Sequence, residues 1–309
     1  MNTIAAYAPG HITGIFYIDD TSENPLNRGS LGAGFSIEQG VTTRIQTISQ
    51  NPGPPEFYLN NKVSGDLNVS RQLYDHFSQS LSKRPHQQLK IEHTIIPPQS
   101  SGFGTSGAGA LSLSLALNKY FGFPFTTEQA SHFAHIAEIE CRTGLGTVIG
   151  EYFGGFELRT VPGAPGVGQV QTFSYPRNLQ ALFAVRGPSL TSKALSDPKI
   201  RNDVNRAGLH NFTELRKNPT VKNFLYYSRT FSVETCLMTP WVETTLELLE
   251  KRGIIGSMLM FGEAVFSLAE DQNMPEITAI LKDICRKTKT GEKISIFSTP
   301  INSTGGIYL

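Results

Sequence analysis

Pro98-Gln-Ser-Ser-Gly-Phe-Gly-Thr-Ser-Gly-Ala-Gly109 is the stretch that decides the fold of this chain. The β-branched residues 91–96 before it predict a strand, and the apolar run after it predicts a helix that ends at Gly122. Glycines let a backbone approach an anion closely, and the free N–H groups at a helix N-terminus attract negative charge. The stretch therefore predicts a phosphate-binding loop, in which Ser106 or Thr105 can hold a Mg²⁺ that bridges phosphates.

The same stretch also fits the dinucleotide fingerprint GxGxxG, at residues 102–107. That fingerprint needs a second strand ending in an acidic residue about 20 positions later. Here the next element is a helix that begins at Thr126, because Gln129 follows at capping-box spacing and an apolar pattern continues to Gly144. We therefore reject a dinucleotide site; a tight turn without ligand is the other interpretation.

The composition is that of a globular protein, since 39% of the 309 residues are hydrophobic and 17% are charged. The 27 basic and 26 acidic side chains nearly cancel, and no block of Lys or Arg indicates a nucleic-acid or membrane partner. Cys141, Cys236 and Cys285 are too far apart for a disulfide framework or a zinc cluster, which favours a reducing compartment. Without a signal peptide or a spanning segment in the sequence, we expect a cytoplasmic protein.

The length predicts two packed domains. Strand-like segments interrupted by two helices fill the first half, and helices dominate after Gly187. We therefore expect an N-terminal domain over residues 1–187, which carries the phosphate loop, and a C-terminal domain over residues 188–309. Helices in the second half are expected near residues 221–234, 242–251 and 277–285, followed by strands at 293–297 and 305–309.

Three motifs together resemble the GHMP kinase superfamily of small-molecule kinases. The glycine stretch resembles its second motif, Pro-x-x-x-Gly-Leu-Gly-Ser-Ser-Ala, with Phe103 in place of Leu. Ala8-Pro-Gly-His-Ile-Thr-Gly-Ile-Phe16 resembles the first motif, and Phe261-Gly-Glu-Ala-Val-Phe266 resembles the end of the third. The resemblance implies an α+β fold of two domains, the first like domain 2 of ribosomal protein S5 and the second ferredoxin-like, with ATP bound between them.

Two further segments are similar to the archaeal pantoate kinases within this superfamily. They are Arg28-Gly-Ser-Leu-Gly-Ala-Gly34 and Ala137-Glu-Ile-Glu-Cys-Arg-Thr-Gly-Leu-Gly-Thr-Val148, the latter followed by Gly154-Gly155. The resemblance implies transfer of the ATP γ-phosphate to (R)-pantoate in coenzyme A synthesis, with Mg²⁺ as cofactor, and a homodimer. It assigns ATP binding to Pro98, Ser101, Gly102, Phe103, Gly104, Thr105, Ser106, Gly107 and Ala108.

The resemblance also implies a glutamate ligand for Mg²⁺ on the helix after the loop. Glu138 and Glu140 are both candidates, and two residues apart on a helix they point in different directions. We expect Ser106 and Glu138 to hold the metal. Many family members place an aspartate soon after this helix to take the substrate proton, but Thr147 stands near that position here. We expect catalysis without a carboxylate base, with Glu151 or His135 as the alternative.

A carboxylate substrate favours an arginine partner, because the guanidinium group binds carboxylates through two hydrogen bonds. Arg28, Arg142 and Arg159 all lie near family-like segments, and we expect Arg142 to be the partner. The remaining candidates for substrate binding are His11, Ser30 and Gly144. A kinase for another alcohol, such as mevalonate, and a ligand sensor without activity stay open as alternatives, because one methylene in a pocket discriminates weakly.

Overall fold

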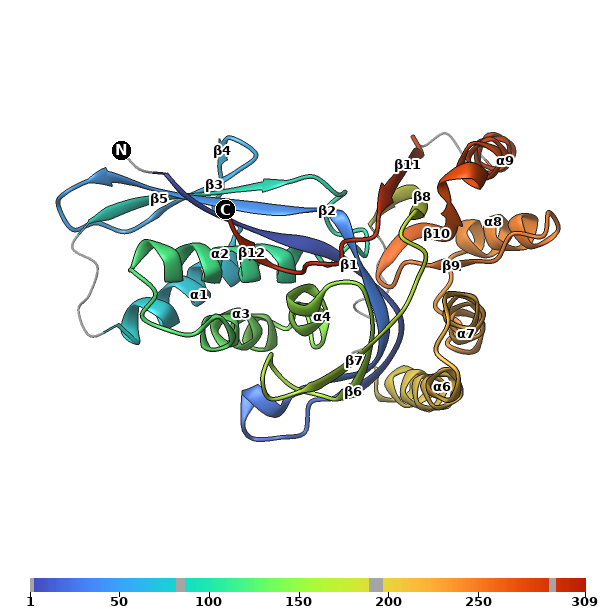
Figure 1. The fold of residues 1–309 in the computed structure, drawn as a ribbon, viewed down its shortest axis with the longest axis horizontal. Helices are drawn as coiled ribbons and strands as arrows, with labels where there is room; N and C mark the ends of the chain where they lie inside the picture. Colours follow the sequence, from blue (N-terminus) through green and yellow to red (C-terminus); the bar gives the residue numbers. More distant parts are fainter. Residues whose placement is uncertain (1–2, 82–86, 189–196, 289–292) are drawn as a thin grey trace.

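Two β-sheets flanked by helices make up the chain in a computed structural model, which describes residues 3–81, 87–188, 197–288 and 293–309. Among the described residues, the larger sheet and four helices form one part of the molecule, and the smaller sheet with four further helices forms the other (Figure 1). Within the described residues, no helix has the length and hydropathy needed to cross a membrane.

The larger sheet has the strand order β12-β1-β2-β5-β3-β4, and β6 extends it by pairing with β2 and β7. The longest strand pair of this sheet is the antiparallel pair β1 and β2, whose register runs from Ile4 opposite Ile45 to Asp19 opposite Gly29. The strands are β1 (Ile4–Asp19), β2 (Gly29–Ser49), β3 (Glu56–Leu59), β4 (Lys62–Val63), β5 (Gln88–Ile95), β6 (Phe156–Val161), β7 (Gln169–Phe173) and β12 (Ile307–Tyr308).

Helices cover one face of this sheet, and α2 lies directly against β1 and β2 (Figure 1). Almost every residue of α2 is buried, because the sheet lies on one side of it and α1 and α3 on the other. The helices are α1 (Asn68–Gln79), α2 (Thr105–Tyr120), α3 (Thr127–Cys141) and α4 (Thr147–Phe153), and a short 3₁₀ turn η1 covers Pro25–Asn27.

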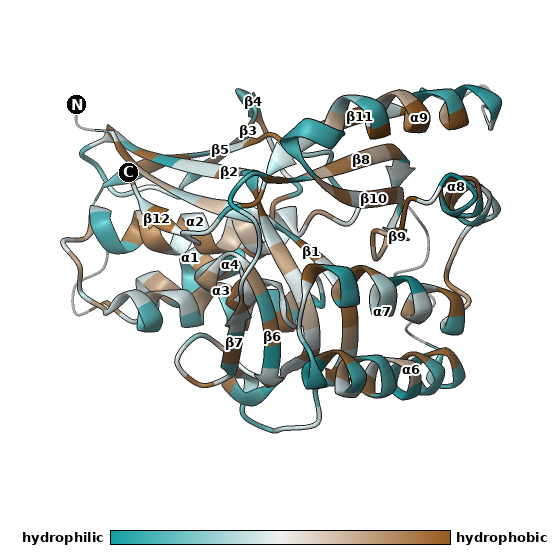
Figure 2. Cartoon of the chain, turned by 45° about the vertical axis from the view of Figure 1, so that its right-hand side comes forward, coloured by the Kyte–Doolittle hydropathy of each residue, from teal (hydrophilic) through white to brown (hydrophobic). Residues whose placement is uncertain are grey.

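The smaller sheet has the order β11-β8-β10-β9, and all its strand pairs are antiparallel. Hydrophilic residues lie on the outward turns of α6 and α9, whereas β8 and β10 are largely hydrophobic (Figure 2). The elements are β8 (Leu179–Pro188), α6 (Pro198–Lys217), α7 (Val221–Glu234), α8 (Pro240–Glu250), β9 (Gly256–Met258), β10 (Gly262–Glu270), η2 (Asp271–Asn273), α9 (Met274–Lys287) and β11 (Ser295–Pro300).

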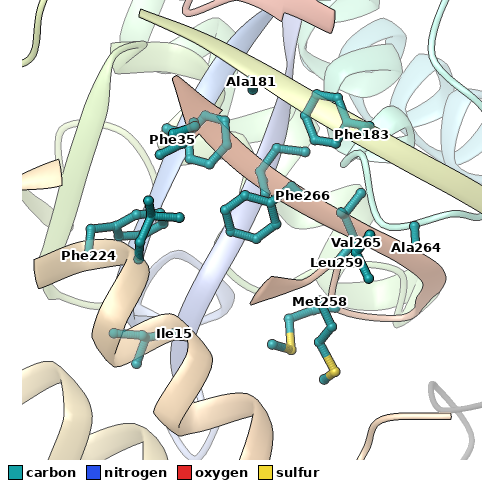
Figure 3. Close-up of a cluster of buried hydrophobic side chains, with 14 of the residues drawn as sticks. Ile15, Phe35, Ala181, Phe183, Phe224, Met258, Leu259, Ala264, Val265 and Phe266 are labelled. Carbon is teal, nitrogen blue, oxygen red and sulfur yellow. The ribbon is translucent and has the colours of Figure 1, made fainter. Parts of the chain in front are cut away.

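One hydrophobic core joins the two sheets. Phe35 of β2 stacks on Phe156 of β6 with ring centroids 5.0 Å apart, and it also meets Phe224 of α7 and Phe266 of β10 edge to face. Figure 3 shows Phe35, Phe224 and Phe266, with Phe183 nearby. Because aromatic rings bury large areas, this cluster holds β2 and β6 firmly against α7 and the smaller sheet.

Most predicted elements are present, including the capping box at Thr126, where both hydrogen bonds with Gln129 form. The prediction of only two helices in the first half was wrong, since α1 and α4 are helical too. The polar α1 has no side-chain cap, and α4, which has about two turns, starts in a glycine-rich stretch, so neither helix has a local start signal.

The change from one sheet to the other comes before Leu179, because all of β8 pairs within the smaller sheet. The expected boundary at Gly187 therefore falls inside β8, and residues 189–196, at the start of the expected second domain, lie outside the described residues. The chain also returns to the larger sheet through β12. The division into domains 1–187 and 188–309 stays a proposal.

Candidate active site

The glycine loop connects β5 to α2, and its backbone is suited to an anion. Gly102 and Gly104 both have positive φ, of 89° and 65°, a conformation that glycine adopts without strain. Gly104 is the N-cap of α2 and has no side chain to satisfy the first-turn N–H groups. These N–H groups, at Thr105, Ser106 and Gly107, therefore remain available to a phosphate.

The two other family-like motifs touch this loop. The His11 N–H of β1 donates to the Phe103 carbonyl oxygen at 2.9 Å. A Cβ added at Gly262, at the start of β10, would lie only 2.1 Å from the Ser101 carbonyl oxygen. Phe103 is buried against Phe183 and so fixes the loop to the smaller sheet. Segments from three distant parts of the sequence thus converge on the loop, whose first residue, Pro98, stays partly exposed.

Ser106 and Glu138 lie together at the start of α2. Glu138 is 2% exposed and accepts hydrogen bonds from Ser106 Oγ at 2.5 Å and from Thr143 Oγ1 at 2.7 Å. Burial raises the pKa of Glu138, and these two hydrogen bonds offset part of the rise. Glu140 instead faces the surface, where its carboxylate binds His76 and Gln72. The two glutamates diverge as their spacing predicted, and Glu138 is the one at the loop.

Thr147 and Glu151 of α4 lie against the other side of the loop. A Cβ added at Gly104 would be 2.7 Å from Thr147 Cγ2 and 2.8 Å from Glu151 Oε1. Glu151 is fully buried, and neither of its oxygens has a hydrogen-bond partner in the described part of the chain. Its pKa lies well above the ordinary value, because burial disfavours the charge and the carboxylates of Glu138 and Glu157 repel it.

A buried charged cluster lies next to this pair and involves β1 and β6. Glu157 Oε1 forms an ion pair with Arg159 and lies 2.9 Å from His11 Nε2. Arg159 is only 1% exposed, and its Nε has no partner within the described residues. This Nε lies beside Gly146 and the buried Ser30, because a Cβ added at Gly146 would contact both the Arg159 Nε and the Ser30 Oγ.

The three candidate arginines have very different surroundings. Arg28 donates from Nε to its neighbouring Ser22 carbonyl oxygen at 2.6 Å, outside the cluster. Arg142 is exposed at the end of α3, where it has a left-handed backbone with φ of 56°. Gly144, by contrast, lies close to both Glu138 and Thr147. The structure brings Ser30 and Gly144 into the site but leaves Arg28 and Arg142 at its periphery.

Glu157 was not predicted from the sequence, and Arg142 was preferred to Arg159 as the partner of a carboxylate. The signal was present in β6, because Glu157 and Arg159 are two residues apart, so share one face, and alternate with the apolar Phe156 and Leu158. A charged pair on a buried strand is rare unless the charges neutralise each other. His135, the other alternative base, is hydrogen-bonded to the Pro25 carbonyl oxygen, and burial lowers its pKa to about 4.

Known proteins resemble this chain along nearly its whole length. A model of the GHMP kinases N terminal domain matches residues 68–155, which include the loop, Glu138 and α4. Pantoate kinase of Methanocaldococcus jannaschii is 31% identical over 277 residues, covering 90% of this chain and 97% of that protein. The chain belongs to the pantoate kinase family. A second member, from Thermococcus kodakarensis, is 30% identical over 288 residues, covering 91% of this chain and 92% of that protein.

Solved structures agree with this family. One described as a phosphotransferase related to the CoA biosynthesis pathway has a TM-score of 0.86 and 25% identity, covering 99% of this chain and 98% of that one. A homoserine kinase from Cytophaga hutchinsonii has a TM-score of 0.73 at 16% identity, covering 100% and 98%, and shares the fold. The predicted α+β GHMP kinase fold and the family are therefore confirmed, and the chain is an ATP-dependent kinase.

Proposed function

We propose that this enzyme transfers the γ-phosphoryl group of ATP to the terminal hydroxyl of (R)-pantoate, giving 4-phosphopantoate for coenzyme A synthesis. The two curated relatives at 30% identity or more both carry the name pantoate kinase. The observation that carries the proposal is the buried Arg159, whose unpartnered Nε lies beside Ser30 and Gly146, and Gly146 directly precedes Thr147. A buried guanidinium with a free donor is a natural partner for the pantoate carboxylate.

ATP is proposed to place its phosphates on the N-terminus of α2, where Gly102, Gly104 and Gly107 leave the backbone uncovered. Ser106 and Glu138 suit a Mg²⁺ bound to those phosphates, because both side chains offer hard oxygen ligands. Their Oγ and Oε1 atoms already lie 2.5 Å apart. Mg²⁺ keeps several waters and commonly takes one or two carboxylates besides phosphate, so this small set of protein ligands is sufficient. The ion would supply neutralisation of the phosphate charge.

The chain's own residues then orient the acceptor. Arg159 and Ser30 would hold the carboxylate end of pantoate. His11, held in place by its hydrogen bond with Glu157, would form part of the inner wall of the site. Thr147 and Gly144 lie on the side where the reacting hydroxyl must meet the phosphate loop. Among the arginines, Arg142 is our second candidate, because its exposed side chain has room to turn toward Gly144.

A coupled ADP-release assay with Mg·ATP tests this function against (R)-pantoate, mevalonate, homoserine and galactose. Release that depends on pantoate alone, with the phosphorylated product identified by mass, is expected. ADP release with another alcohol would show that the enzyme is a kinase for a different substrate. No ADP release with any of the alcohols would favour a ligand sensor. Arg159→Lys, which keeps the charge but loses the paired donors, should raise KM for pantoate far more than KM for ATP.

We also propose, from the family resemblance, that the enzyme is a homodimer in the cytoplasm. Light scattering of the purified protein at several concentrations measures its oligomeric state directly. A molecular mass near twice the 33.9 kDa of one chain is expected.

A further inference from the structure

Glu151 is the one described carboxylate at the phosphate loop that is both fully buried and without any partner for its oxygens. Glycines at the loop make room for it. A Cβ at Gly107 would lie 2.7 Å from Glu151 Oε2, and one at Gly104 would lie 2.8 Å from Oε1. The Ala108 N–H also approaches this carboxylate, but it donates its hydrogen bond to the Gly104 carbonyl oxygen at 3.0 Å. A buried polar group without a partner is costly, so its presence here needs a reason.

The other two buried carboxylates of the site are already engaged. Glu138 accepts hydrogen bonds from Ser106 and Thr143. Glu157 is neutralised by Arg159 and contacts His11. The charges of these two carboxylates act on Glu151 through space, and within the described residues no group forms a hydrogen bond with either of its oxygens. A partner for it must arrive with the substrates, as a hydrogen-bond donor or as a cation, because a phosphate, being an anion, supplies neither.

The proposed reaction brings one such donor. When the acceptor oxygen bonds to the γ-phosphorus, the bond from that phosphorus to the bridging oxygen of ADP breaks, and the acceptor hydroxyl loses its proton. We propose that the Glu151 carboxylate accepts this proton. This step rests on the kinase function proposed above. It replaces our expectation from the sequence that no carboxylate base takes part, which followed from Thr147 standing where an acid was looked for.

The helix places Glu151 where this role requires it. Thr147 and Glu151 are four residues apart on α4, so they share one face, and a helical side chain leans toward the N-terminus of its helix. The Gly107 position accordingly touches Thr147 Cβ at 3.2 Å as well as the Glu151 carboxylate. Because Thr147 is partly exposed, a hydroxyl that packs on its side chain comes within reach of the carboxylate beside it.

The environment of Glu151 also suits a proton acceptor. Burial and the carboxylates of Glu138 and Glu157 raise its pKa, and a carboxylate with a raised pKa holds an incoming proton more strongly than an exposed one does. Only the ionised form accepts a proton, so turnover should rise with pH through the pKa of this group. The proposal thus predicts an acid-side limb in the pH profile of kcat.

Glu151→Gln tests the proposal, with Glu140→Gln on the exposed face of α3 as the matched control. We expect kcat of Glu151→Gln with Mg·ATP and pantoate to fall by about 10²- to 10⁴-fold, and its acid-side limb to disappear. Its KM for ATP should change little, since ATP makes no proposed contact with Glu151. KM for pantoate should change far less than kcat, because the amide oxygen of Gln still accepts a hydrogen bond from the acceptor hydroxyl but does not take its proton. Glu140→Gln should keep the kcat and pH profile of the wild type.

Glu151→Asp provides a second route in case the amide variant does not fold. It keeps the charge but withdraws the carboxylate by one methylene, so kcat should fall at least tenfold while the acid-side limb remains. An unchanged kcat and pH profile in either folded variant overturns the proposal. So does a kcat of Glu151→Gln that recovers at high Mg²⁺ concentration, because that result makes Glu151 a metal ligand. A wild-type enzyme silent with every alcohol instead overturns the kinase function itself.

Discussion

Replacing Arg159 by Leu should destabilise the protein strongly, because the change leaves a charge buried. Glu157 is 0% exposed, and without Arg159 its carboxylate keeps only the contact with His11. Removing one partner of a buried ion pair costs about 3–5 kcal/mol. With an unfolding entropy of about 2.1 cal/mol/K per residue, 309 residues give about 0.65 kcal/mol/K, so Tm should fall by about 5–8 °C.

Thermal unfolding followed by circular dichroism measures this shift. Arg206→Leu is the control, since Arg206 is 79% exposed and its pair with Asp203 is a surface ion pair worth less than about 1 kcal/mol. Adding Glu157→Gln to Arg159→Leu removes the stranded charge and should restore more than half of the lost Tm. A fall below about 2 °C in Arg159→Leu, or simple additivity in the double variant, would refute the reasoning.

Three other changes probe the site and the core. Glu138→Gln should lower kcat about a hundredfold or more with the fold intact, as judged by circular dichroism, whereas equal activity in Glu138→Gln and Glu140→Gln would move the metal elsewhere. Gly14→Ala should cost about 1–3 kcal/mol in urea unfolding, because its Cβ would lie 2.2 Å from Ser228 Oγ; an unchanged midpoint would contradict this packing. The raised pKa of Glu151 means that the folded protein holds its proton more tightly than the unfolded one, so stability should fall as pH rises from the ordinary carboxyl pKa of 4.5 toward the folded value. The free energy of unfolding should change by at most about 1.4 kcal/mol per pH unit from this group, and Glu151→Gln should lose that contribution. Parallel curves of stability against pH for the wild type and Glu151→Gln would exclude a contribution from Glu151.

The phosphate loop could be predicted from the sequence because its signals are local. Glycines, a helix start and the capping box at Thr126 all act within a few residues, and the structure has the strand, loop and helices in those places. The divergence of Glu138 and Glu140 likewise follows from helical geometry alone.

The polar interior of the site depends on contacts between distant segments, which local patterns do not contain. Arg142 and Arg159 look alike in the sequence, yet α3 ends at the surface and β6 lies inside the sheet. Glu151 was only an alternative base in the sequence, because its burial without a partner depends on the packing of α2 against α4. The place of β8 in the smaller sheet was missed for the same reason, since its partners β10 and β11 come much later in the chain.

The return of the chain to its first strand has a consequence for synthesis. Residues after β11 run back beside β2, where the Asn302 N–H donates to the Ser36 carbonyl oxygen and the Asn302 carbonyl oxygen accepts from the Gly155 N–H, and then β12 pairs with β1. The edge of the first sheet is thus completed by a segment that leaves the ribosome long after its neighbour. Until then β1 exposes an unpaired edge, which other chains can join, so slow translation or loss of the last residues should promote aggregation.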